Sequence, residues 1–149
     1  MVFTTIALIS FDVGSMLYFI RGGKITWAGT LEAYYIDMNI EEKALSTFRI
    51  APWRHNCAQA VCFALGREDL LEVVSECGGG KAPDGLCGAL YGALLCSSAQ
   101  IGEELKRQFV EKLGYSRCKE LKQKGGVSCR ECVACASALA FRFQGGVEE

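Results

Sequence analysis

Apolar residues recur at every third or fourth position along most of the chain after residue 38. The first such stripe, within residues 40–48, follows Asn39, a residue type that caps helices. Glu42 stands three residues after Asn39 and completes a capping-box pattern. This pattern predicts a helix that begins directly after Asn39.

Similar patterns predict the remaining elements. The predicted helices are 54–65 before Gly66, 67–77 before the glycine run 78–80, the segment after Cys87, 102–113 before Gly114, 116–124, and 129–143 behind a Ser128–Glu131 capping box. No alternating strand pattern follows residue 38. We therefore predict an all-α fold, a single compact bundle of about six helices in which a glycine-rich loop leads into the helix after Cys87.

Residues 1–37 sustain neither a helical nor a strand period, and Gly22, Gly23 and Gly29 interrupt them. We interpret residues 1–37 as an N-terminal extension that is non-native or poorly ordered, with Met38 as the true start and residues 38–146 as the domain. A membrane anchor in residues 1–20 is the less favoured alternative, because Asp12 near its centre would cost about 2.5–3.5 kcal/mol. No basic residue precedes this apolar stretch, which argues against a secretory signal.

The composition, with 50% hydrophobic and 22% charged residues in 149, is that of one globular domain. Nine cysteines are far above average usage, but an odd number in a chain of this length fits a disulfide scaffold poorly. We therefore predict a cytoplasmic protein whose thiols stay reduced unless they bind a metal or cycle between dithiol and disulfide.

The net charge of −1 predicts no binding to nucleic acid or to a membrane surface. Residues 106–130 nevertheless contain eight Lys or Arg and two Glu, a local charge of +6. This segment could form a positive collar that attracts an acidic redox partner protein. A solvated amphipathic face without any partner is the alternative, and a homodimer is left open.

Four cysteines stand where a thiolate would be stabilised. Cys87 and Cys129 fall at predicted helix starts, where unpaired N–H groups and the helix dipole favour negative charge. Cys118 lies between two cationic residues, and Cys57 follows His55 and Asn56 early in its helix. Each thiol could instead be a small buried core residue.

The other cysteines are less distinctive. Cys62, Cys96, Cys132 and Cys135 fall among apolar residues within helices, which is typical of the core, and Cys77 beside the glycine run stays ambiguous. The Cys129–Cys132–Cys135 spacing matches the first three ligands of a ferredoxin run, but the fourth cysteine is missing and a helix is predicted there. The chain has neither a haem-attachment motif nor a nucleotide-binding glycine motif.

The chain resembles the redox-active proteins that are named for their C_GCAxxG_C_C cysteine pattern. The resemblance rests on "NCAQAV", "GGG", "CGALYG", a Cys-x-Glu-Leu element and the last helix, and it covers residues 38–143. It implies an all-helical redox domain whose functional cysteines are Cys57, Cys87, Cys118 and Cys129. A related domain occurs in a haem-containing cytochrome that also carries an iron–sulfur centre. The five additional cysteines depart from the family pattern.

We expect the four family cysteines to meet at one site, where the repulsion between thiolates calls for a cation. The leading hypothesis is an iron–sulfur cluster or Zn²⁺ for electron transfer or redox sensing, with no haem and no nucleotide. The predicted ligands are Cys57, Cys87, Cys118 and Cys129, with Cys77 or Cys132 as substitutes and Gly79, Gly80 and Gly88 allowing close backbone approach. The alternatives are a thiol–disulfide oxidoreductase that uses a pair of these thiols and a structural zinc domain.

Overall fold

The computed structural model of the chain describes residues 6–7, 18–21, 24–27 and 39–144. The chain divides into two units, Met1–Asn39 and Ile40–Glu149. Each unit is described by itself below.

The described part of the first unit is a small antiparallel sheet with strand order β1-β2-β3. The strands are β1 (Ile6–Ala7), β2 (Tyr18–Arg21) and β3 (Lys24–Trp27). Arg21 pairs with Lys24, so two residues separate β2 from β3. We did not predict these strands, although aromatic and β-branched residues around a Gly-Gly pair are a hairpin signal. Met38 and most of the predicted extension lie outside the described residues.

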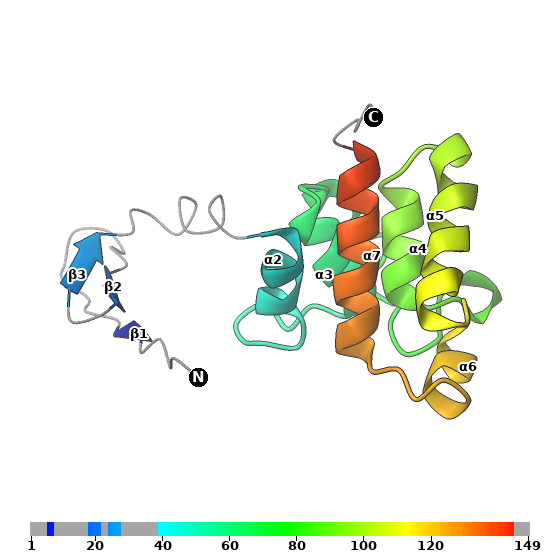
Figure 1. Cartoon of the computed structure of the whole chain (residues 1–149), viewed down its shortest axis with the longest axis horizontal. Helices are drawn as coiled ribbons and strands as arrows, with labels where there is room; N and C mark the ends of the chain where they lie inside the picture. The colour runs from blue at the N-terminus through cyan, green and yellow to red at the C-terminus, as the bar shows by residue number, and fades with distance from the viewer. Residues whose placement is uncertain (1–5, 8–17, 22–23, 28–38, 145–149) are drawn as a thin grey trace. The chain divides into compact units, whose positions relative to one another are not determined.

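The second unit is helical, and it confirms the predicted all-α bundle of six helices (Figure 1). The helices are α2 (Ile40–Thr47), α3 (Cys57–Ala64), α4 (Gly88–Leu95), α5 (Ala99–Leu113), α6 (Cys118–Gln123) and α7 (Cys129–Gln144). Gly66 and Gly114, at the predicted helix ends, both have the positive φ angles that favour glycine. Ser128 and Glu131 form the predicted capping box at the start of α7.

The helix predicted over residues 67–77 is wrong. Only a 3₁₀ turn, Glu68–Leu70, forms there, and turns follow it. Side chains at the start of α3 donate hydrogen bonds to backbone carbonyl groups of this segment. Gln59 Nε2 donates to Leu71 O at 3.1 Å, and Asn56 Nδ2 donates to Val74 O at 3.0 Å. Contacts with α3 have therefore replaced the regular helical pattern that the propensities favour.

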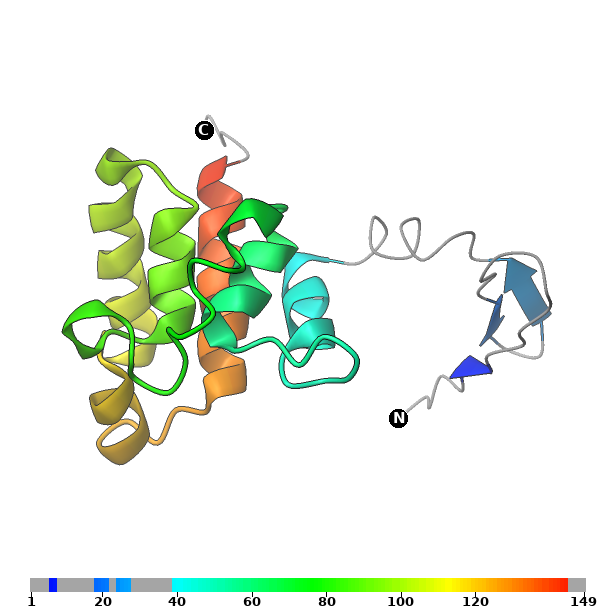
Figure 2. The ribbon, with the colours of Figure 1, turned by 180° about the vertical axis from the view of Figure 1, so that it is seen from behind.

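Helix α7 packs against α2, α3, α4 and α5, and α3 also packs directly against α4 (Figures 1 and 2). Helices α3 and α4 approach each other closely at Gly92, where a Cβ atom would lie 2.8 Å from the carbonyl oxygen of Ala58. The largest fully buried side chains are Phe109, Leu90 and Leu105. Within the described ranges, no helix has the length and apolar character needed to cross a membrane.

A chain that begins at Met38 is expected to keep the full helical content and melting temperature of the whole chain. The buried residues that form the described core all lie at or after Ala44, so the bundle has its own core. Circular dichroism of the two chains should give Tm values within about 2 °C, a shift that corresponds to well under 1 kcal/mol. A loss of several degrees, or insolubility, would show that residues 1–37 stabilise the bundle.

Candidate functional site

The four cysteines predicted as ligands all stand at helix starts. Cys57, Cys118 and Cys129 are the first residues of α3, α6 and α7, and Cys87 is the N-cap of α4. The sequence analysis placed Cys57 and Cys118 further inside their helices, and the observed helix starts lie three residues later for Cys57 and two residues later for Cys118. Backbone N–H groups at these helix starts interact with two of the sulfurs: Ala58 with Cys57, and Ala89 and Leu90 with Cys87.

These four cysteines surround one small cavity, which we call the thiol cavity. Its volume is about 10 Å³, roughly the room that a single water-sized sphere needs. It is lined by Cys57, Cys87, Gly88, Cys118, Leu121, Lys122, Val127, Cys129 and Cys132. The fifth cysteine is therefore Cys132, one turn after Cys129 on α7, and Cys77 is not part of the lining.

Backbone contacts join the starts of α4 and α6. The N–H of Cys87 donates to the carbonyl of Ser116 at 2.8 Å, and Leu86 forms an isolated antiparallel bridge with Arg117. Because these contacts flank Cys87 and Cys118 directly, they fix the two thiols beside the same cavity.

Hydrogen bonds of Asn56 fix the start of α3. Its side chain accepts from the Gln59 N–H at 2.8 Å, and the Gln59 side chain accepts from the Asn56 N–H at 3.0 Å, which completes a capping box. The Asn56 amide also donates to the Ser75 carbonyl at 2.8 Å. The sequence analysis missed this box, although the Asn-x-x-Gln spacing around Cys57 signals it.

Gly88 allows the closest approach at the site. A Cβ atom at residue 88 would lie 2.5 Å from Cys57 Sγ and 2.5 Å from the carbonyl oxygen of Cys77. A carbonyl oxygen of the main chain cannot move aside as a flexible side chain can, so only glycine fits here. Gly80 is close to Cys118, since its Cβ atom would lie 3.8 Å from Cys118 Sγ, and the backbone N–H of Gly79 interacts with Cys57.

Cys87 and Cys132 form a coupled pair within the cavity. A hydrogen bond from the Cys132 thiol, opposed by burial, lowers the pKa of Cys87 to about 7. The backbone N–H groups of Leu90 and Ala89 and the charge of Lys122 act in the same direction. The same hydrogen bond with Cys87, together with burial, raises the pKa of Cys132. Cys87 is thus the thiol of this pair that ionises near neutral pH.

The remaining thiols respond to burial and to one another. Burial raises the pKa of Cys57, and negative charge on Cys87 or Cys129 raises it further. Burial also raises the pKa of Cys118, although Lys122 opposes that shift. The pKa of Lys122 is itself raised by Cys129 and Cys118. Ionisation of a second thiol in the cavity therefore costs free energy unless positive charge compensates the added negative charge.

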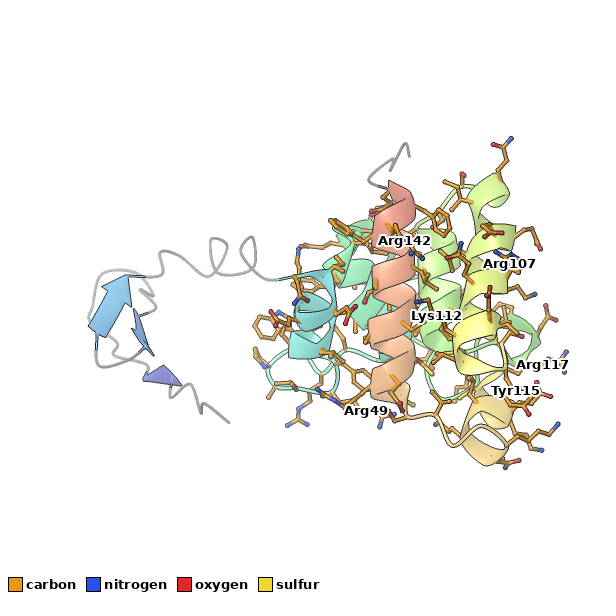
Figure 3. All side chains as sticks on the ribbon, viewed as in Figure 1. Arg49, Arg107, Lys112, Tyr115, Arg117 and Arg142 are labelled. Atoms are coloured by element: carbon orange, nitrogen blue, oxygen red, sulfur yellow. The ribbon has the colours of Figure 1, made fainter. Side chains whose placement is uncertain are left out.

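Two basic grooves border the thiol cavity and share Lys122. The first has a volume of about 780 Å³ and is lined by Gly79, Gly80, Asp84, Gly85, Arg117, Cys118, Lys119, Glu120, Lys122, Gln123 and Lys124. The second, of about 630 Å³, is lined by Phe48, Arg49, Ile50, Lys122, Val127, Ser128, Cys129 and Arg130. Figure 3 shows Arg49 and Arg117 at the end of the bundle that carries the helix starts.

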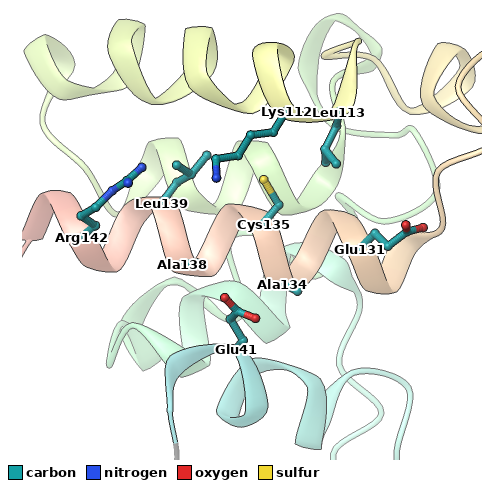
Figure 4. A pocket seen from close by; sticks show the side chains of 9 residues that line it. All are labelled: Glu41, Lys112, Leu113, Glu131, Ala134, Cys135, Ala138, Leu139 and Arg142. Atoms are coloured by element: carbon teal, nitrogen blue, oxygen red, sulfur yellow. The ribbon is translucent and has the colours of Figure 1, made fainter.

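Cys135 points away from the thiol cavity. It lines a separate groove of about 580 Å³, where its side chain and that of Lys112 lie between α7 and α5, and Glu41 extends from α2 (Figure 4). The Cys129–Cys132–Cys135 run is therefore divided between two sites, because each step of three residues falls about 60° short of a full turn and two steps place Cys135 about 120° from Cys129. His55, the single histidine, is buried and is not part of the cavity lining.

As the sulfurs stand in the described residues, no group of three or more Cys, His, Asp or Glu side chains has the geometry to hold a metal ion. The donor set itself suits thiophilic metals, since five thiols line one enclosed space. Metal binding would therefore require the sulfurs to shift. No protein-family model, curated protein or solved structure matches the chain.

The substitution Gly88→Ala is expected to lower the free energy of unfolding by about 1–3 kcal/mol, because the added methyl group overpacks the contact with Cys57 and Cys77. Urea unfolding followed by circular dichroism measures this change. The matched control is Gly102→Ala in α5. A Cβ atom at residue 102 would meet only a side-chain atom of Leu94, at 3.4 Å. The control should be neutral or stabilising by up to about 1 kcal/mol. Equal stability of both variants would contradict the close approach.

In metal-free, reduced protein, the ultraviolet absorbance of thiolate should rise in a step centred near pH 7 that is missing in Cys87→Ser. The pKa of Cys87 is about 7, so the thiol is protonated below this pH and ionised above it. Cys132→Ala removes the hydrogen-bond donor and should move the step to higher pH, whereas Cys135→Ser should leave it in place. A step that survives in Cys87→Ser would assign the low pKa to another group.

Proposed function

We propose that this chain is a small redox protein whose thiol cavity binds an iron–sulfur or other metal–thiolate centre, for electron transfer or redox sensing. The observation that carries the proposal is the lining of the cavity, where cysteines at the starts of α3, α4, α6 and α7 meet. The proposal also assumes a reducing compartment such as the cytoplasm, where free thiols persist.

The number of thiols favours a metal centre. Dithiol chemistry requires two cysteines, whereas five line this cavity, and their charges raise one another's pKa values. Among the lining side chains Lys122 is the single cation, which is insufficient to balance several thiolates. A bound cation would supply the missing positive charge, and the thiols would lose protons when it binds.

Cys57, Cys87, Cys118 and Cys129 would hold the centre, and Cys132 is the nearest substitute ligand. The centre would supply the redox-active or Lewis-acidic metal. The protein would contribute backbone N–H groups at the helix starts, which stabilise negative charge on sulfur. Gly79 and Gly88 would allow the backbone to lie close to the ligands. Lys122, at the junction of the two basic grooves, would add positive charge beside Cys118 and Cys129.

The basic grooves also support an acidic protein as redox partner. Lys119 and Lys122 are exposed beside Cys118, so a partner with surface carboxylates would meet positive charge next to a ligand. Part of the predicted collar is not available for this role, because Arg107 pairs with Glu104 and Glu111 on α5. The attraction would weaken with salt over a screening length of about 8–10 Å.

Thiol–disulfide exchange is the second candidate function, and the Cys87–Cys132 pair favours it. The Cys87 thiolate would attack a substrate disulfide and release one substrate thiol. Cys132 would then attack the mixed disulfide, which releases the second thiol and leaves a Cys87–Cys132 disulfide. Two electrons pass from the protein to the substrate in this sequence.

Anaerobic purification followed by metal and sulfide analysis should yield protein with iron and acid-labile sulfide, together with a visible absorption band. Cys118→Ser should lose most of the bound metal, because it removes one of four ligands. Cys135→Ser is the matched control and should keep the wild-type content, since Cys135 lines a different groove.

Stoichiometric zinc in colourless protein would support a structural metal site instead. Metal-free protein that forms a Cys87–Cys132 disulfide and reduces a model disulfide would support the second candidate and overturn the metal centre. Equal metal content in Cys118→Ser and Cys135→Ser would remove Cys118 from the ligand set.

A further inference from the structure

A second pair of thiols lies outside the thiol cavity, at the far ends of α3 and α4. Cys96 Sγ and Cys62 Sγ are 3.7 Å apart, and Cys62 Sγ is 3.8 Å from the carbonyl oxygen of Gly92. Cys96 is the C-cap of α4, not a residue within the helix as predicted. The pair belongs to a small apolar cluster with Ala58 and Val74, separate from the main core.

We propose that Cys62 and Cys96 form a reversible redox disulfide that joins α3 to α4. The sulfur separation must fall from 3.7 Å to about 2.05 Å, an approach of less than about 2 Å. The two helices are already in backbone contact at Gly92 and Ala58, so no rearrangement of the bundle is needed to bring the thiols together.

The two thiols differ in access. Cys96 is 8% exposed, whereas Cys62 is fully buried. Cys96 is therefore the thiol that meets an oxidant, and only a small one can reach it. The hydrogen bond between Cys96 and Cys62 lowers the pKa of Cys96 against the effect of burial, and the charge of Arg67 acts in the same direction. Cys62, the buried partner, has a raised pKa and stays protonated.

A hydroperoxide is an oxidant of suitable size. The Cys96 thiolate attacks one peroxide oxygen; an S–O bond forms, the O–O bond breaks, and the departing oxygen leaves as water or an alcohol after it takes a proton. The sulfur of Cys62 then attacks the Cys96 sulfenic acid, so that the S–S bond forms, the S–O bond breaks and water leaves. Two thiols are thereby oxidised by two electrons and one peroxide is reduced. A dithiol reductant reverses the change by exchange.

Formation of this disulfide can be tested on the full, reduced chain by titration with hydrogen peroxide, alkylation of the remaining thiols and mass spectrometry under non-reducing conditions. Tryptic peptides 55–67 and 82–106 each carry two cysteines. Chymotryptic cleavage after Tyr91 separates Cys87 from Cys96, and fragment-ion spectra separate Cys57 from Cys62. The expected product links Cys62 to Cys96 and disappears after treatment with dithiothreitol.

Two variants sharpen the test. Cys96→Ser should lower the yield of disulfide-linked Cys62 by at least about tenfold, because it removes the sulfur that lies 3.7 Å from Cys62 Sγ. Cys135→Ser, a half-buried cysteine outside the pair, should leave the yield unchanged. The wild-type linkage map decides the question even if Cys96→Ser folds poorly.

Two results would overturn the proposal. In the first, Cys62 and Cys96 remain open to alkylation in unfolding buffer after Cys135 and the cavity thiols have been oxidised. In the second, Cys96 proceeds to sulfinic or sulfonic acid without a link to Cys62, which would show that the pair cannot close. Because neither cysteine lines the thiol cavity, both results would leave the proposed metal centre untouched, and loss of that centre would not affect this pair.

Discussion

The close approach of α4 to Cys57 is the constraint on which the thiol cavity depends. No atom larger than hydrogen fits on the α-carbon of residue 88, because Cys57 Sγ and the Cys77 carbonyl occupy the space. With glycine there, the start of α4 reaches the start of α3, and the N–H of Cys87 can bond to Ser116 ahead of α6. Three of the four helix starts are thus brought together by a missing side chain and one backbone hydrogen bond.

The sequence was informative about the elements and their ends. Capping residues, terminal glycines and apolar spacing predicted most helices because these signals are local: Ser128 with Glu131 opens α7, and Gly114 closes α5. The segment 67–77 failed because its carbonyl groups bond to Asn56 and Gln59, which are distant in sequence. Propensity has no information about such tertiary contacts.

The site could be predicted only in part. Charge, helix position and the resemblance to the C_GCAxxG_C_C pattern together singled out Cys57, Cys87, Cys118 and Cys129, all of which line the cavity. Cys132 looked like a core residue because its neighbours in sequence are apolar, and its place in the cavity depends on the rotation of α7. The Cys62–Cys96 contact was invisible for a related reason. It follows from the crossing of α3 and α4, which the sequence pattern does not determine.

The cavity gathers residues that are far apart in the sequence of the bundle, from Cys57 in α3 to Cys132 in α7. An unfolded chain does not hold these groups together, so an occupant would bind the native state more tightly than the unfolded one. By mass action, such an occupant would stabilise the fold by up to about 2.7 kcal/mol at one hundred times its dissociation constant. Binding of the occupant and unfolding of the bundle would then be linked equilibria. A cell that withdrew the occupant would therefore also shorten the lifetime of the protein.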